Sequence, residues 1–214
     1  MSQVLATTAA GTIARVNLAT LKYILISESH TDAIVQVAYD KGSNERFATA
    51  SLDGTLRVWD IVEYVMISTA RARKEQERGV VPQCLVFANI LISGWSDGRL
   101  LAHSAETGDS LWVLDNAHPG GVTAVTLSNN RRFVLSGGPA GEVRLWELRS
   151  RELISHLKEH KQKVTSLMLF EDDTMAVSGS RDRCILRWDL RNEVRASNML
   201  DRSAWLDVLP ATTP

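Results

Sequence analysis

Cysteine is scarce in this sequence, since its 214 residues include only Cys84 and Cys184. Two cysteines cannot build the disulfide framework of a small secreted domain. The sequence also lacks any Asn-X-Ser/Thr acceptor for N-glycosylation. Both absences favour a reducing environment inside the cell.

Neither sign of charge is in excess, because 24 Lys and Arg face 25 Asp and Glu, for a formal net charge of −1. This balance argues against nucleic acid or a membrane as a partner. The longest apolar stretch, from about Cys84 to Trp95, is far shorter than the ~20 residues of a membrane-spanning helix. The N-terminus lacks a basic leader and a continuous apolar core, so we interpret it as strands instead of a targeting peptide.

Compact catalytic and metal-binding motifs are missing as well. There is no His-Glu-X-X-His, no paired Cys-X-X-Cys and no Gly-X-X-X-X-Gly-Lys phosphate loop. His156 and His160 are four residues apart, a spacing that would suit a metal on a helix, but both fall in a region expected to form strands and turns. We therefore expect no metal, no cofactor, no small-molecule substrate and no enzymatic activity. Cys184 is expected to be a small core residue.

A strand-turn-strand phrase is present instead, and it returns five times at intervals of 42 to 44 residues. Its clearest copies are ATASLDGTLRVWD, ending at Asp60, and VSGSRDRCILRWD, ending at Asp189. Trp59, Trp146 and Trp188 mark three copies, while Val16 and His103 hold the matching place in the other two. A period near 43 residues with four short strands per unit is typical of a WD-type β-propeller.

The repeat predicts an all-β WD40 β-propeller of about five four-stranded blades, the first and last incomplete. We expect a partial blade over 1–30, full blades over about 31–70, 80–115 and 118–158, a last blade over 160–200, and a non-repeat tail over 201–214. Because an open sheet leaves strand edges unpaired, these blades are expected to form an arc of a larger seven-bladed ring. A ring closed with few blades is the alternative.

Polar residues recur with the blades and predict a buried hydrogen-bond network. An Asp lies six residues before the marker position, a hydroxyl lies four before the Asp, and a His lies 28 or 29 before the marker. The members of this structural network are His30, Thr49, Asp53, Trp59, Ser93, Asp97, His118, Ser136, Trp146, His160, Ser178, Asp182 and Trp188. Since the set recurs beside a Trp, we interpret it as structural and not as a catalytic Ser-His-Asp site.

Two blades depart from the pattern. One has His103 in place of Trp and Glu75 near the place of its His; the other has Ala140 in place of Asp. If a missing member left a buried donor unpaired, the cost would be about 1–3 kcal/mol. We therefore expect the partners of missing members to be absent too, or to be replaced by water.

Two features are candidates for partner binding. The segment 71–78 carries four basic residues, Arg71, Arg73, Lys74 and Arg78, and two acidic ones. It is either a solvated loop with internally compensated charge or a contact for an acidic partner. Trp95 precedes a corner where smaller residues are usual, so it is either wedged between blades or an aromatic partner contact.

Several phrases resemble one family of WD-repeat proteins in particular. They are Leu91-Ile-Ser-Gly-Trp-Ser-Asp-Gly-Arg-Leu100, Ala105-Glu-Thr-Gly108, Asn116-Ala-His-Pro-Gly-Gly-Val-Thr-Ala124, Gly141-Glu-Val-Arg-Leu-Trp146, Leu157-Lys-Glu-His160 and the stretch from Ser180 to Glu193. They are similar to the cilia- and flagella-associated protein 52 family, over about Val4 to Ser197. The resemblance implies a non-enzymatic protein inside the doublet microtubules of the axoneme, with tubulin and other microtubule inner proteins as partners.

The residues and the resemblance together predict a structural protein that lines ciliary or flagellar doublet microtubules, located in the cytoplasm, cytoskeleton and axoneme. The alternative is a soluble WD40 adaptor that recruits protein partners in a cytosolic complex. Family members are much longer than this chain, and residues from Met199 onward do not follow the family. No individual tubulin-contact residue is implied by the resemblance.

Overall fold

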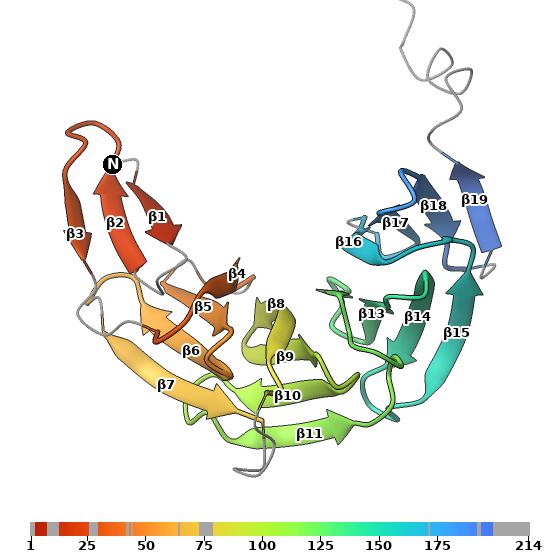
Figure 1. Ribbon diagram of the computed structural model, residues 1–214, viewed down its shortest axis with the longest axis horizontal. Helices are drawn as coiled ribbons and strands as arrows, with labels where there is room; N and C mark the ends of the chain where they lie inside the picture. Colours follow the sequence, from red (N-terminus) through yellow and green to blue (C-terminus); the bar gives the residue numbers. More distant parts are fainter. Residues whose placement is uncertain are drawn as a thin grey trace, which may run out of the picture. The chain divides into compact units, whose positions relative to one another are not determined.

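The protein is described by a computed structural model that covers residues 3–7, 13–25, 30–41, 43, 45–63, 65–72, 79–170, 172–191 and 194–198. Within these ranges the regular structure is entirely β-strand (Figure 1). In the same ranges no helix is long and apolar enough to cross a membrane. The chain divides into two compact units, Met1–Val122 and Thr123–Pro214, and each is described by itself.

The first unit contains three antiparallel sheets, each built from strands that are consecutive in the sequence. The first sheet has three strands, β1 (Gln3–Thr7), β2 (Ile13–Asn17) and β3 (Tyr23–Leu25). The second has four, β4 (Ile34–Tyr39), β5 (Arg46–Ser51), β6 (Thr55–Asp60) and β7 (Met66–Arg71). The third also has four, β8 (Pro82–Ala88), β9 (Ile90–Trp95), β10 (Leu100–Ser104) and β11 (Ser110–Leu114).

The second unit contains two four-stranded antiparallel sheets of the same kind. One is formed by β12 (Ala124–Leu127), β13 (Phe133–Gly137), β14 (Glu142–Glu147) and β15 (Leu153–Lys158). The other is formed by β16 (Val164–Leu169), β17 (Met175–Ser180), β18 (Ile185–Asp189) and β19 (Val194–Asn198). Because β19 completes the last sheet, the expectation of an incomplete last blade is wrong. Among the described residues the first sheet has three strands, and the tail 201–214 lies outside them.

A register shift recurs at the same place in all four four-stranded sheets, where the third strand pairs with the fourth. It falls at Val58/Trp59, Ala102/His103, Leu145/Trp146 and Arg187/Trp188. Such a shift bends a strand and re-aims the side chain beside it. The marker position of the repeat is therefore also the point where the backbone departs from regular pairing.

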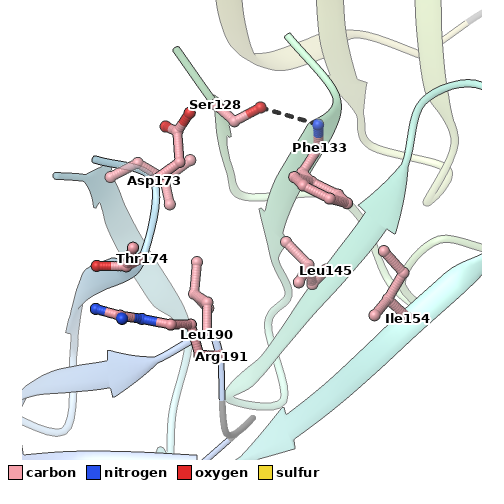
Figure 2. Close-up of a pocket in the computed structure, with 9 residues that line it drawn as sticks. Ser128, Phe133, Leu145, Ile154, Asp173, Thr174, Leu190 and Arg191 are labelled. Atoms are coloured by element: carbon pink, nitrogen blue, oxygen red, sulfur yellow. Dashed lines mark hydrogen bonds between the residues drawn. The ribbon is translucent and has the colours of Figure 1, made fainter. Parts of the chain in front are cut away.

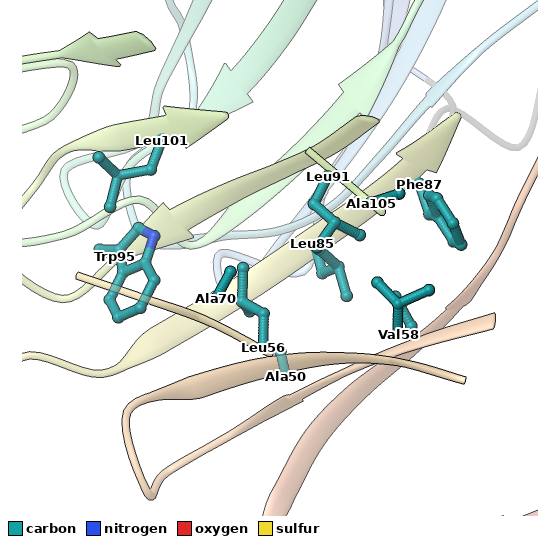
Figure 3. Packing of buried hydrophobic residues seen from close by; sticks show 11 residues of the cluster. Ala50, Leu56, Val58, Ala70, Leu85, Phe87, Leu91, Trp95, Leu101 and Ala105 are labelled. Carbon is teal, nitrogen blue, oxygen red and sulfur yellow. The ribbon is translucent and has the colours of Figure 1, made fainter. Parts of the chain in front are cut away.

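Apolar side chains between neighbouring sheets form the core of each unit. In the first unit, Ala48, Ala50, Leu56 and Val58 of the β4–β7 sheet pack in one cluster with residues of the β8–β11 sheet, among them Leu85, Phe87, Leu91, Trp95 and Leu101 (Figure 3). In the second unit, a matching cluster includes Leu135, Leu145, Val164, Leu186 and Trp188. Removing this surface from water, at about 25 cal/mol per Å², is the main force that stacks one sheet on the next.

Candidate functional site

The β4–β7 sheet carries a complete four-residue network. His30 Nδ1 lies 2.8 Å from Asp53 Oδ2, and His30 Nε2 lies 2.7 Å from Thr49 Oγ1. Trp59 donates its indole N–H to the same Thr49 oxygen over 2.9 Å. A neutral imidazole fits this chain because it donates from Nδ1 to the carboxylate and accepts at Nε2 from the hydroxyl. The four side chains thereby tie together the segment before β4 and strands β5 and β6.

The β16–β19 sheet repeats this geometry. His160 Nδ1 lies 3.0 Å from Asp182 Oδ2, His160 Nε2 lies 2.7 Å from Ser178 Oγ, and Trp188 donates to Ser178 over 2.8 Å. The set has the composition of a catalytic triad, but Ser178 has no exposed surface and already accepts the indole N–H. A nucleophile must be reachable by substrate. The geometry is therefore that of a cross-link between strands.

Asp53 and Asp182 are stabilised as carboxylates by the groups around them. Burial acts to raise the pKa of Asp53, but hydrogen bonds from Thr55, His30 and the Thr31 backbone outweigh it and lower the pKa. Burial likewise opposes the shift at Asp182, where N–H groups of Lys161 and Cys184, together with His160, lower the pKa to about 2. Burial lowers the pKa of His30, against the raising effect of Asp53. His30 is thus favoured in its neutral form.

The β8–β11 sheet builds its network from different residues. Its marker position is His103, which is buried and donates from Nε2 to the Arg71 carbonyl over 3.2 Å. The indole comes instead from Trp95, whose Nε1–H donates to Ser93 Oγ over 2.8 Å. Asp97, which the repeat assigns to the network, pairs with the Arg99 guanidinium and backbone N–H. Glu75 lies outside the described residues.

Trp95 is fully buried at 0% exposure, within the core cluster between the β4–β7 and β8–β11 sheets. Its assignment as a partner contact is therefore wrong, and the wedged position is the correct interpretation. The physical reason is that packing in this cluster removes the large apolar ring from water, while its N–H keeps a partner in Ser93. The indole enters the core from β9.

The β12–β15 sheet retains only part of the set. Trp146 donates to Ser136 Oγ over 2.8 Å, and Ala140 replaces the Asp. His118 belongs to the first unit, where it is fully buried and its backbone N–H donates to the Gly98 carbonyl over 3.1 Å. The sheet thus keeps the link between its hydroxyl and its indole without a carboxylate at the corner.

Two structural groups were not foreseen from the sequence. Thr55 donates to Asp53 Oδ1 over 2.6 Å and lies 3.1 Å from His30 Nδ1. Its place, two residues after the Asp, holds Arg99 and Cys184 in other sheets, so the repeat gave no signal for it. Asp173 accepts the N–H groups of Asn129 and Asn130 over 2.7 and 2.8 Å and thereby fastens the β16–β17 turn to the β12–β13 turn.

The remaining candidates lie apart from the networks. Arg71 is exposed at the end of β7, whereas Arg73, Lys74 and Arg78 lie outside the described residues.

His156 is exposed on β15 while His160 is buried, so they do not form a pair of metal ligands. In the part of the chain that the structure describes, no three His, Cys, Asp or Glu side chains gather as metal ligands would. Cys84 is buried, whereas Cys184 is only half-buried just before β18 and is not the core residue expected; the two are not joined by a disulfide.

A WD-repeat β-propeller is defined by four-stranded sheets that repeat along the sequence and carry a recurrent set of His, Asp, hydroxyl and Trp side chains. Residues 21–60, 108–147 and 151–189, more than half of the chain, match the family model described as WD domain, G-beta repeat. The chain therefore belongs to the WD-domain, G-beta repeat family. The expected all-β WD40 fold is confirmed.

Within this family, the resemblance to cilia- and flagella-associated protein 52 is also confirmed. The protein of that name from Sus scrofa is 33% identical over 201 residues, which cover 88% of this chain and 31% of the pig protein. The one from Chlamydomonas reinhardtii is 29% identical over 198 residues, with the same two coverages of 88% and 31%. The chain thus spans about a third of the length of these relatives.

A likeness to a solved structure concerns the fold alone. The crystal structure of the computationally designed Ika8 protein has a TM-score of 0.77 and 24% sequence identity to this chain. The matched region covers 92% of this chain and 58% of the designed protein.

Proposed function

We propose that this chain is a non-catalytic structural protein of the ciliary or flagellar axoneme. It lines the inside of doublet microtubules and stabilises the lattice by contacts with tubulin and other inner proteins. The observation that carries the proposal is the similarity to cilia- and flagella-associated protein 52, which extends over 88% of the chain in both a mammal and a green alga. The relatives' name supplies the ciliary association; the microtubule lumen and the tubulin contacts are part of the proposal.

The buried networks support a binding role over a catalytic one. In the two complete sets, each His bonds to a carboxylate and a hydroxyl, and that hydroxyl also accepts an indole N–H. Their bonding capacity is used inside the sheets, which leaves the connecting loops to meet partners. On a periodic polymer, modest contacts of this kind add up through multivalency.

The test is to express the tagged full-length protein in a ciliated cell and to extract the axonemes with detergent and then with salt. A lattice protein remains with the doublets after both steps, and cross-linking then recovers tubulin peptides. A protein released with the soluble fraction, with cytosolic proteins as its only cross-linked neighbours, would refute the proposal. That result would favour a soluble adaptor instead.

The basic segment 71–78 is the proposed contact with the acidic surface of the lattice. Arg71 is exposed at one end of it. Reversing charge in the Arg71→Glu, Arg73→Glu double variant is expected to weaken retention in salt-extracted axonemes, because guanidinium groups pair well with carboxylates. The control is the Lys22→Glu, Lys158→Glu double variant, which changes the net charge equally at exposed positions elsewhere. Equal retention of the two variants would remove the segment from the proposal.

A further inference from the structure

The second unit contains an apolar cavity of about 290 Å³ between its two sheets (Figure 2). Its wall consists of five apolar side chains from both sheets, Phe133, Leu145, Ile154, Leu169 and Leu190. Ile154, on β15, is 39% exposed, so this part of the wall is accessible to solvent. The cavity is large enough for one aliphatic or aromatic side chain of a partner.

The polar residues at this cavity are of two kinds. Ser128 and Asp173 are engaged within the protein, because Ser128 donates to Asn130 Oδ1 over 2.8 Å and Asp173 holds the β12–β13 turn. Arg191 is exposed where it lines the cavity, and it interacts electrostatically with Asp172. A ligand that reaches the apolar wall therefore meets a guanidinium group at the edge.

A second cavity, of about 510 Å³, lies at the β12–β13 and β14–β15 turns of the same unit. It is lined by Arg131, Arg132, Glu147, Leu148 and Arg149. Lining residues of the two cavities lie close together, because the Arg132 guanidinium of the second cavity is 5.3 Å from the centre of the Phe133 ring of the first. The turns that supply these arginines, β12–β13 and β14–β15, lie at the same end of one antiparallel sheet.

Positive charge exceeds negative charge in this second cavity. Three arginines face one carboxylate, that of Glu147. The Arg132–Glu147 pair is 3.8 Å apart with the Arg132 side chain 67% exposed, so the pair is weak. Glu147 also accepts the Ser150 hydroxyl over 2.9 Å. One carboxylate does not compensate three guanidinium groups, and the cavity suits an anionic ligand.

We propose that the two cavities bind an acidic segment of a partner protein, with one apolar side chain in the apolar cavity. Carboxylates on either side of that anchor pair with Arg132 and Arg149 in one direction and with Arg191 in the other. Forked guanidinium donors match carboxylates, and a buried anchor residue supplies most of the affinity at such sites. The inference names the partner chemistry for the binding role proposed above and rests on it.

The test uses the purified full-length chain and fluorescein-labelled synthetic peptides, with binding followed by anisotropy. The probe is a peptide with one central leucine flanked on both sides by glutamates. One comparison peptide carries serine in place of the leucine, and a second carries glutamines in place of the glutamates. The glutamate–leucine peptide is expected to bind most tightly, and added salt is expected to weaken it.

Variants assign the binding to this place. Arg132→Glu with Arg149→Glu is expected to weaken the leucine peptide about tenfold, through the reversal of two partly exposed charges. Ile154→Ser is expected to weaken the leucine peptide and to leave the weaker serine peptide unchanged, because it alters only the apolar wall. Lys161→Glu with Arg181→Glu is the matched control, since these exposed residues lie at the opposite end of the neighbouring sheet.

Three results would overturn the inference. They are equal binding of the glutamine and glutamate peptides, an equal loss in the control pair, or binding of a single-stranded oligonucleotide with no binding of any peptide. If the double arginine variant does not fold, as judged by circular dichroism, the Ile154→Ser variant and the peptide series decide the question. No axoneme enters this experiment, so its failure is distinguishable from failure of the proposed function.

Discussion

Trp95 donates its indole N–H to Ser93 Oγ over 2.8 Å, and both side chains are fully buried. The two residues are two positions apart on the same strand, β9. In the other four-stranded sheets the corresponding indole lies ten residues after its hydroxyl, on the third strand. The same bond is therefore made in every four-stranded sheet, but in the β8–β11 sheet the donor arrives from a different strand.

Replacing Trp95 by Phe is expected to lower the free energy of unfolding by about 1–3 kcal/mol, because the buried indole N–H bond to Ser93 is lost. Trp95→Ala is expected to cost about 3–5 kcal/mol, because a cavity is added. Urea unfolding followed by circular dichroism measures both values. Trp112→Phe is the control: Trp112 is half-buried and a much smaller change is expected. Equal costs for the two Phe variants would contradict this account of Trp95.

The repeat made most of the fold accessible from the sequence. The markers Trp59, Trp146 and Trp188 and the Asp-Gly corners indicated where strands begin and end, because turn residues and apolar alternation recur at fixed places. The residues of the complete sets could be named because each has the same offset from its Trp. These are local properties of the chain, and their repetition in each unit strengthens the prediction.

The features that the fixed offsets did not predict are contacts set by the three-dimensional arrangement of the strands. Trp95 donates to Ser93 in the sheet whose marker position is His103, and no fixed offset predicts this exchange, because the indole comes from β9 and not from the third strand, β10. The hydrogen bonds between Asp173 and the β12–β13 turn join residues more than 40 positions apart. Their donors are backbone N–H groups, which every residue except proline has, so the sequence carries no signal for them. The apolar cavity likewise exists only where two sheets meet.

The network of the β16–β19 sheet is expected to be cooperative. His160→Ala leaves Asp182 and Ser178 without their imidazole partner, at a cost of about 1–3 kcal/mol in the free energy of unfolding. His156→Ala is the control, because His156 is exposed and lies four residues away. In a double-mutant cycle, adding Asp182→Ala to His160→Ala is expected to cost less than the sum of the single changes. Strict additivity would show that the two side chains do not act as one network.

Stability is expected to fall as the solution becomes acidic, in two ranges. Burial lowers the pKa of His30 and of His103 below 6.5, so the unfolded chain binds protons more readily than the folded one. Their stabilising contribution is complete above pH 6.5 and is lost as the pH falls from there towards the lowered values. Asp182, with a pKa of about 2 against 3.8, adds a second loss below about pH 4.

Urea midpoints measured from pH 8 to pH 5 test the first of these ranges. His103→Gln keeps an amide donor near the position of Nε2 for the Arg71 carbonyl and removes the titrating group, so its midpoint is expected to fall less steeply with pH than that of the unchanged protein. His156→Gln is the control at an exposed position. A midpoint that stays constant or rises on acidification would contradict the assignment of buried neutral histidines.

Two glycines at equivalent corners are expected to respond differently to alanine. Gly54 and Gly98 each follow the corner Asp, with φ of +80° and +89°. A Cβ at Gly54 would lie 3.6 Å from the Val80 carbonyl oxygen, whereas one at Gly98 would lie 2.1 Å from that of His118. Gly54→Ala therefore carries only the left-handed backbone cost of about 1–2 kcal/mol.

Gly98→Ala carries the same backbone cost and a steric one, because the corner must move away from the segment that contains His118. Overpacking of this kind adds about 1–3 kcal/mol, so the Gly98 variant is expected to be the less stable of the two. Thermal unfolding of both variants beside the unchanged protein measures the difference, and the first unit contains both sites. Equal melting temperatures for Gly54→Ala and Gly98→Ala would contradict this account. They would mean that the corner containing Gly98 moves away from His118 without a cost in stability.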